Sequence, residues 1–261
     1  MRRIRLGACL ALVGCCVAAG AADSPALLLT DGSSRPSELD RLVSLQAPLT
    51  CGGGHARVVA LTFDDGPGPY TERLLDLLQR WHAAATFFLV ADRISEWPNL
   101  PAKETALGAI GDHTWSHPRL PLLPYRAAVW EIEGARSALA AASHTRIDLF
   151  RPPYGLLTPK LQRLVFAKKM LDVRWSVDSR DYALSSPASI ARNVERAVRP
   201  GSIVLLHDIH APTVAAVGRI LPALARRHLR SVTIPQLLVV DPPQLRGRSL
   251  VCGSNAAPLR D

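Results

Sequence analysis

The alternation of short apolar segments with amphipathic ones restricts the fold of this chain more than any other feature. The segments 58–63, 85–90, 149–150, 173–177 and 202–206 are short and apolar, as expected of buried strands, and 231–234 closes the series. Helical patterns occupy residues 69–81, 125–142, 158–168, 189–198 and 214–227. Strands that alternate with helices form parallel sheets covered by helices, so we expect an α/β layer or barrel fold.

The N-terminus has the layout of an export signal. Three arginines, Arg2, Arg3 and Arg5, precede an apolar run over 6–19, and small residues follow it. This pattern predicts a secretory signal peptide over residues 1–22. The segment 12–15 also resembles a lipobox, with Cys15 as the residue that would carry lipid. Because the apolar run continues past Cys15, we favour export without lipidation.

The remainder of the chain is long enough for one domain with a substantial core. We expect a linker or N-terminal arm over 23–56, a folded domain over 57–240 and a polar tail over 241–261. Outside the signal segment the cysteines are Cys51 and Cys252, which flank the domain. They are candidates for a disulfide in an oxidising compartment, although spacing alone does not fix the pairing.

The formal net charge of +9 is spread through the chain, without a long basic run or interleaved aromatic residues. This distribution argues against nucleic-acid binding and is typical of a solvated surface. A basic protein is also attracted to anionic polymers of a cell envelope.

Polar side chains follow the predicted strands. They are Asp64 and Asp65 after 58–63, Arg151 after 149–150, Asp178 and Asp181 after 173–177, and His207 and Asp208 after 202–206. In parallel α/β folds the carboxyl ends of the strands lie on one side of the sheet, where functional sites form. The sequence therefore predicts that these residues converge on one pocket.

Two of the clusters indicate a metal site. In T-F-D-D-G-P, residues 62–67, two adjacent carboxylates repel each other unless a cation lies nearby; the alternative is a simple turn. In H-T-W-S-H, residues 113–117, two histidines at i and i+4 are predicted on one face of a helical turn, spaced to hold one ion. The alternative is a pair of surface or capping histidines. His113, His117 and one aspartate would suit zinc with an open position, whereas a structural site would be closed by protein.

A third cluster is R-P-P-Y-G, residues 151–155. Its two prolines lack backbone donors, so the N–H of Tyr154 is the first one free to point into a site; the alternative is a plain loop. The clusters W-S-V-D-S-R-D-Y, residues 175–182, and L-L-H-D, residues 205–208, carry little information alone.

Taken together, the five clusters resemble the polysaccharide deacetylases of carbohydrate esterase family 4, or NodB homology domains, from about residue 58 to about residue 238. The resemblance implies an irregular (β/α) barrel. It implies Asp65, His113 and His117 as ligands of a divalent metal, usually Zn²⁺, with Co²⁺ or a similar ion as an alternative. It also implies Asp64 as the general base, held in place by Arg151.

The remaining roles implied by the resemblance concern the other side of the pocket. His207 would be the general acid, oriented by Asp181, and the Tyr154 N–H would face the oxyanion. The substrate pocket would be lined by Trp175, Leu205, Asp178 and Tyr182. Tyr182 stands where the family often has Trp.

The function expected from this resemblance is removal of N-acetyl groups from N-acetylglucosamine units of a cell-wall polysaccharide, with release of acetate. The polymer would be peptidoglycan or a chitin-like oligomer. The alternatives are an O-acetyl xylan esterase on the same fold and a non-catalytic carbohydrate-binding relative. We expect an exported monomer that binds no nucleic acid.

Overall fold

The computed structural model describes residues 37–246 and 249–252. The predicted signal peptide over 1–22, Cys15 and the first part of the predicted linker lie outside these residues. Within the described part of the chain, no helix has the length and apolar character needed to cross a membrane.

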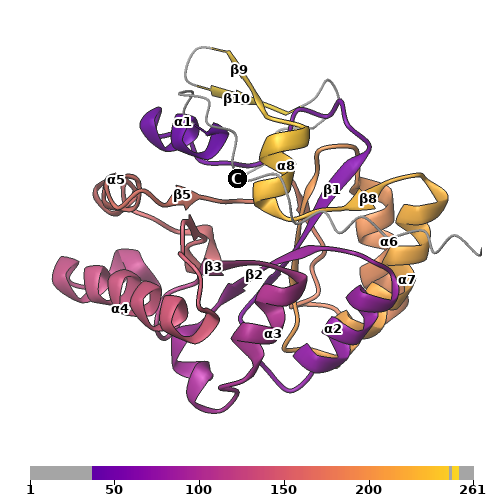
Figure 1. Ribbon diagram of the computed structural model, residues 1–261, viewed down its shortest axis with the longest axis horizontal. Helices are drawn as coiled ribbons and strands as arrows, with labels where there is room; N and C mark the ends of the chain where they lie inside the picture. The colour runs from indigo at the N-terminus through magenta and orange to yellow at the C-terminus, as the bar shows by residue number, and fades with distance from the viewer. Residues whose placement is uncertain (1–36, 247–248, 253–261) are drawn as a thin grey trace, which may run out of the picture. The chain divides into compact units, whose positions relative to one another are not determined.

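A parallel sheet curled into a half-barrel forms the centre of the fold (Figure 1). Its strands are β1 (Val58–Asp64), β2 (Ala85–Leu89), β3 (Gly108–Asp112), β4 (Leu149–Phe150), β5 (Leu171–Asp172), β6 (Val177–Asp178), β7 (Ile203–His207) and β8 (Arg230–Ser231). The strand order is β5-β4-β3-β2-β1-β7-β6, and β8 pairs with the first residues of β1. This architecture confirms the predicted irregular (β/α) barrel.

Helices cover the outside of the sheet. They are α2 (Thr71–Arg80), α3 (Leu100–Leu107), α4 (Tyr125–Ser143), α5 (Pro159–Ala167), α6 (Pro187–Ala197) and α7 (Ala211–Arg226). Neighbours contact one another in the order α6, α7, α2, α3, α4, α5 (Figure 1). Their buried apolar stripes, such as Leu74 and Leu78 of α2, pack on the sheet and keep water from the core.

The sequence patterns did not predict the strand β3 or the helix α3 before it. The segment G-A-I-G-D of β3 has one β-branched residue, Ile110, and no aromatic residue, whereas most strands are enriched in both types. Its glycines are explained by packing, because a Cβ on Gly111 would lie 2.4 Å from Cδ1 of Phe88 in the neighbouring strand. Close approach of the two strands therefore removes the signal by which β3 would be recognised.

The prediction of one strand over 173–177 was wrong in its extent. The structure has two short strands, β5 and β6, at opposite edges of the sheet, and residues 173–176 connect them. Backbone groups on either side bind this connection, since Arg174 N donates to Leu49 O at 2.6 Å and Ser176 N donates to Ile203 O of β7 at 3.0 Å. The predicted closing segment 231–234 likewise divides, with β8 followed by helix α8 (Ile234–Val240).

Both ends of the described chain form secondary structure. Helix α1 (Glu38–Ser44) buries Leu42, and strands β9 (Gln244–Arg246) and β10 (Ser249–Val251) form an antiparallel pair. Cys51 and Cys252 form a disulfide with their Cα atoms 5.5 Å apart. Asp241 accepts hydrogen bonds from the backbone N–H groups of Gly54 and His55, both at 2.9 Å. These contacts join both ends of the described chain to the barrel.

Candidate functional site

The carboxyl end of β1 carries the first pair of charged residues. Arg151 is fully buried after β4, and its Nη1 donates to Asp64 Oδ1 at 2.7 Å and to Thr62 Oγ1 at 2.8 Å. Its other donors reach the carbonyl oxygens of Val173 and Arg174 at 3.2 and 3.0 Å. A guanidinium bound on all sides fixes the Asp64 carboxylate in one orientation. Oδ2 of Asp64 then remains on the pocket side, 3.7 Å from His113 Nε2.

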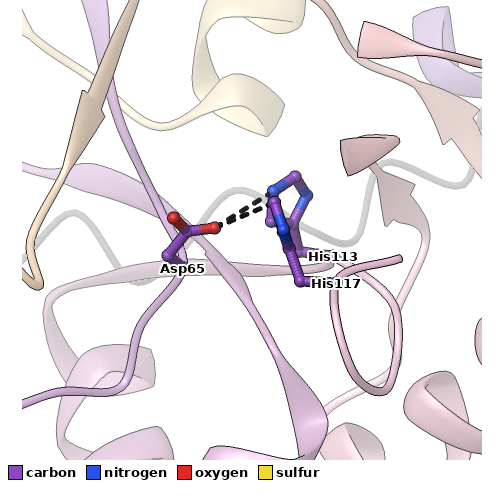
Figure 2. A group of neighbouring side chains, drawn as sticks. All are labelled: Asp65, His113 and His117. Atoms are coloured by element: carbon purple, nitrogen blue, oxygen red, sulfur yellow. Dashed lines mark ion pairs between the residues drawn. The ribbon is translucent and has the colours of Figure 1, made fainter. Parts of the chain in front are cut away.

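Asp65, His113 and His117 face one another (Figure 2). Oδ1 of Asp65 lies 3.2 Å from Nε2 of His117 and 3.5 Å from Nε2 of His113. The same oxygen is buried and has no hydrogen-bond partner among the described residues. A buried carboxylate oxygen without a donor is costly unless a cation or proton reaches it. Oδ1 of Asp65 is therefore the atom at which a cation between the three side chains would bind.

The backbone that carries these residues differs from the predicted helical turn. His113 follows β3, and residues 113–117 form a loop in which Thr114 and His117 have φ of 72° and 58°. Asp65 and Tyr154 also have positive φ, at 70° and 58°. Left-handed backbone at non-glycine residues is disfavoured and persists only where the surroundings impose it. The two imidazoles meet because of this strained loop and not because of helical spacing.

The protonation of the two histidines suits them to bind a cation. Nδ1 of His113 lies 2.6 Å from the carbonyl oxygen of Arg151, so it carries the proton and leaves Nε2 as an acceptor facing Asp65. Burial, together with the neighbouring His113, lowers the pKa of His117 and favours its neutral form. Burial alone would raise the pKa of Asp65, but the facing imidazoles, in their protonated form, hold it well below its usual range.

These residues fit a divalent cation. One ligand atom from each of Asp65, His113 and His117 lies within 4.8 Å of the other two. The donor set of two neutral imidazoles and one carboxylate is that of a catalytic site with three protein ligands and an open position. The unpartnered Oδ1 of Asp65 would gain its missing partner from the ion.

His207, at the end of β7, forms a tight pair with Asp181. Its Nδ1 lies 2.7 Å from Asp181 Oδ1, while Asp181 Oδ2 accepts the His207 backbone N–H at 2.7 Å and the Thr213 hydroxyl at 2.8 Å. Burial alone would lower the pKa of His207. The hydrogen bond and charge of Asp181, with a smaller contribution from Asp64 and Asp65, outweigh burial and raise this pKa to about 9. The imidazole is therefore protonated at neutral pH, with Nε2 free to donate.

The three possible cation ligands and His207 open onto one cavity of about 370 Å³. The cavity is lined by ten of the sequence-predicted site residues, namely Asp64, Asp65, His113, His117, Tyr154, Trp175, Asp178, Tyr182, Leu205 and His207, and by Pro152 and His210. The ring of Tyr154 lies edge-on to His117 with centroids 4.7 Å apart. Tyr182 donates its hydroxyl to Asp178 at 3.1 Å. Arg151 and Asp181, the other two predicted residues, lie behind this lining and contact it.

The sequence did not predict the supporting roles of Glu131 and Thr71, and Asp208, which it placed with the pocket residues, does not line the cavity. Glu131 of α4 accepts hydrogen bonds from the N–H and hydroxyl of Ser116 at 2.8 and 2.7 Å, and its carbonyl accepts from Trp115 N at 2.9 Å. Asp208 accepts from the Thr71 hydroxyl, and burial raises its pKa to about 7. A Cβ on Gly66 would lie 2.8 Å from Asp208 Oδ1, which explains the glycine after the two aspartates. Glu131 lies inside an ordinary helical pattern, so nothing in the sequence distinguishes it.

The chain is similar in sequence and in structure to known proteins. Residues 52–170 match the family model described as polysaccharide deacetylase. The chain is 34% identical over 198 residues to a chitooligosaccharide deacetylase from Bradyrhizobium sp., covering 69% of this chain and 90% of that protein. It is 33% identical over 183 residues to the peptidoglycan-N-acetylmuramic acid deacetylase PdaC of Bacillus subtilis, covering 69% of this chain but 38% of that longer protein. The crystal structure of a peptidoglycan N-acetylglucosamine deacetylase superposes with a TM-score of 0.71 at 31% identity, over 76% of this chain and 95% of that one.

Proposed function

Since the chain belongs to the polysaccharide deacetylase family, we propose that it hydrolyses the N-acetyl groups of N-acetylglucosamine units in a cell-wall polysaccharide, releasing acetate. The observation that supports this proposal most is the convergence, in one cavity, of a three-residue cation site, a fixed carboxylate and a protonated imidazole. These are the groups that hydrolysis of an unactivated amide requires.

Asp64 is the general base in this proposal. Water is a poor nucleophile at neutral pH, so a group in the pocket must accept its proton as it attacks the acetyl carbon. Arg151 engages Oδ1 of Asp64, which leaves Oδ2 as the accepting atom. Because Arg151 is itself held by two carbonyl oxygens, the carboxylate does not need to reorganise during proton transfer.

Attack on the acetyl carbon places negative charge on the former carbonyl oxygen. The backbone N–H of Tyr154, set in a left-handed conformation after Pro152 and Pro153, is the proposed donor to that oxygen. Loss of one such donor typically costs a few kcal/mol of transition-state stabilisation, about 100-fold or more in rate.

His207 is the proposed general acid. The amine of the sugar is a poor leaving group until it gains a proton, and Nε2 of the protonated imidazole can supply one. Asp181 keeps Nδ1 occupied and raises the pKa of His207 to about 9, so the acid is charged before the substrate arrives. The products are acetate and a free amino sugar.

The ion that we propose for Asp65, His113 and His117 is Zn²⁺, with Co²⁺ or a similar ion as the alternative. Imidazole and carboxylate ligands in a three-residue set with an open position support this assignment. When bound, the ion would supply a positive charge that acidifies water and polarises the acetyl carbonyl.

Two further parts of the proposal concern substrate and location. Trp175, Leu205, Asp178 and Tyr182 are proposed to contact the sugar, since they line the cavity around the reacting groups. The signal-like N-terminus and the names of the relatives support an exported enzyme that acts on the envelope, with peptidoglycan and chitin-like oligomers as candidate polymers. We expect it to act as a monomer.

Acetate release from three polymers tests the proposal. Peptidoglycan, chitooligosaccharide and acetylated xylan are each incubated with the purified protein, with and without chelator and added zinc. We expect release from the N-acetylated substrates that stops with chelator and returns with zinc. Release from xylan alone would replace the proposal by an ester hydrolase. No release from any of them, with metal bound, would indicate a non-catalytic carbohydrate-binding relative.

A further inference from the structure

A second recess lies at the end of the barrel opposite to the catalytic pocket. Two adjoining cavities of about 320 and 330 Å³ share His228 and Leu229 in their linings. Arg57 lines one of them and directly precedes β1, while Arg230 of β8 lines the other. Since β1 has seven residues that each rise about 3.3 Å, this groove lies about 20 Å from Asp64 at the far end of the strand.

The groove is positively charged. Its lining includes Arg57, Arg226, Arg227 and Arg230, with His82 and His228, and contains no aspartate or glutamate. None of these arginines forms an ion pair with a carboxylate in the described part of the chain. The groove therefore gathers four cations and leaves them without a partner of opposite charge.

Two of the guanidinium groups are fixed by the fold. Arg227 donates to the carbonyl oxygens of Glu195 and Val198, both at 2.9 Å, and Arg57 donates to the carbonyl of Arg227 at 3.1 Å. These bonds use backbone acceptors, so they position the positive charge without neutralising it. Fixed guanidinium groups lose little conformational entropy when they bind carboxylate or phosphate, and like charges held together gain from an anion between them.

We propose that this groove, defined by Trp81, Arg57, Arg226, Arg227, His228 and Arg230, binds a strand of anionic polysaccharide. The arginines would bind its carboxylate or phosphate groups. Trp81, whose side chain is 43% exposed at the edge of the groove, would pack against a sugar ring. The site would hold a charged envelope polymer at one end of the barrel while the other end remains open to the substrate.

The shape and composition of the groove favour a polymer strand over a membrane. Binding to a lipid surface requires apolar side chains that enter the interface as well as cations. Trp81 is the only large exposed apolar residue among the described residues that line the groove. The cations also surround recesses, which suit an extended chain better than a plane of headgroups.

Binding of the full chain to polygalacturonate, a carboxylated polysaccharide, tests the site. Dextran serves as the neutral polymer, and phosphatidylglycerol vesicles serve as the anionic membrane. The double variant Arg226→Gln/Arg230→Gln removes two exposed cations whose side chains form no hydrogen bond or ion pair with the described residues. Its matched control, Arg73→Gln/Arg163→Gln, removes the same charge from exposed positions on α2 and α5. Acetate release from a short chitooligosaccharide is measured for all of them.

We expect polygalacturonate to bind the wild type and dextran not to bind. The groove variant should bind about tenfold more weakly and with a shallower salt dependence, as expected for losing two charged contacts. The control pair should bind like the wild type, and acetate release should be unchanged in both. Equal loss in the control would reduce the effect to net charge, and binding to vesicles but not to the polysaccharide would assign the groove to a membrane. Absence of polygalacturonate binding would overturn the site without affecting the proposed function.

Discussion

The two flanks of the proposed catalytic pocket combine the same side-chain types, imidazole and carboxylate, at different spacings. On one flank, His207 and Asp181 are 2.7 Å apart, and both oxygens of Asp181 accept hydrogen bonds. On the other, the imidazoles of His113 and His117 stand 3.5 and 3.2 Å from Asp65, whose Oδ1 has no hydrogen-bond donor among the described residues. One carboxylate is satisfied by protein atoms, and the other is not.

This difference separates two kinds of chemistry. A carboxylate bonded to Nδ1 stabilises the charged imidazole, which is why the pKa of His207 rises to about 9. For His117, burial and the neighbouring His113 lower the pKa, and the neutral ring that results can bind a cation. The spacing of the pairs, and not their composition, thus suits one flank to hold a proton and the other to hold the metal ion that we propose.

The largest expected effect is on the flank around Asp65. We expect His117→Ala to lower acetate release by about a thousandfold or more, since a ligand of the ion is lost and several kcal/mol of electrostatic stabilisation depend on that ion. Zinc affinity, measured by competition with a chromophoric chelator, should fall in parallel while the circular dichroism spectrum is retained. His210→Ala, in the same cavity, should keep its zinc affinity. Substantial activity of His117→Ala in the presence of chelator would refute the metal site.

Asp64→Asn separates the base from the cation site. The amide preserves the shape of the side chain but cannot accept the proton of the attacking water, so we expect kcat to fall by about 10²- to 10⁴-fold. Zinc should still bind, because Asp65, His113 and His117 are untouched. Titration with zinc followed by acetate release under saturating substrate checks both parts. Wild-type turnover would show that another group is the base.

Much of this arrangement could be predicted from the sequence because it depends on strand ends. Asp64, Arg151 and His207 each follow a short apolar run, and parallel strands bring such positions together. The loop over 113–117 could not be predicted in the same way. Its i and i+4 histidines match a helical turn, whereas the structure uses positive φ at Thr114 and His117, which residue type did not reveal.

The supporting contacts could not be predicted for a different reason. Thr213 donates a hydrogen bond to Asp181, which lies 32 residues away in the sequence, and Arg174 N donates to Leu49 O, which is also distant in the sequence. No local sequence pattern predicts such contacts. The need for glycine at position 111 could not be predicted either, because it depends on contact with Phe88 in another strand. Such contacts are set by tertiary packing, which periodicity and spacing do not encode.

The charge on the His207 flank can be tested through the pH dependence of kcat/KM, which reports ionisations of the free enzyme. A general acid must be protonated, so activity should fall as the pH rises through the pKa of His207, near 9 in the free protein. Asp181→Asn removes the charge that raises this pKa, and we expect the alkaline limb to move down by about one to two pH units. Asp178→Asn, which removes a pocket carboxylate not bonded to His207, should leave that limb in place. An unmoved limb in Asp181→Asn would separate His207 from the acid role.

The smallest effect should come from the residue that holds the strained loop on the Asp65 flank. Glu131→Ala removes two hydrogen bonds to Ser116, which lies between the two imidazoles, so His117 would be held less firmly. We expect zinc affinity to fall about tenfold, with kcat at saturating zinc close to that of the wild type, as is typical when residues behind the ligands are lost. Glu133→Ala on the same helix, which loses an exposed ion pair with Lys168, is the matched control and should bind zinc normally. Loss of kcat that zinc does not restore would mean that Glu131 supports the pocket as a whole, and the satisfied and unsatisfied flanks would then not be independent.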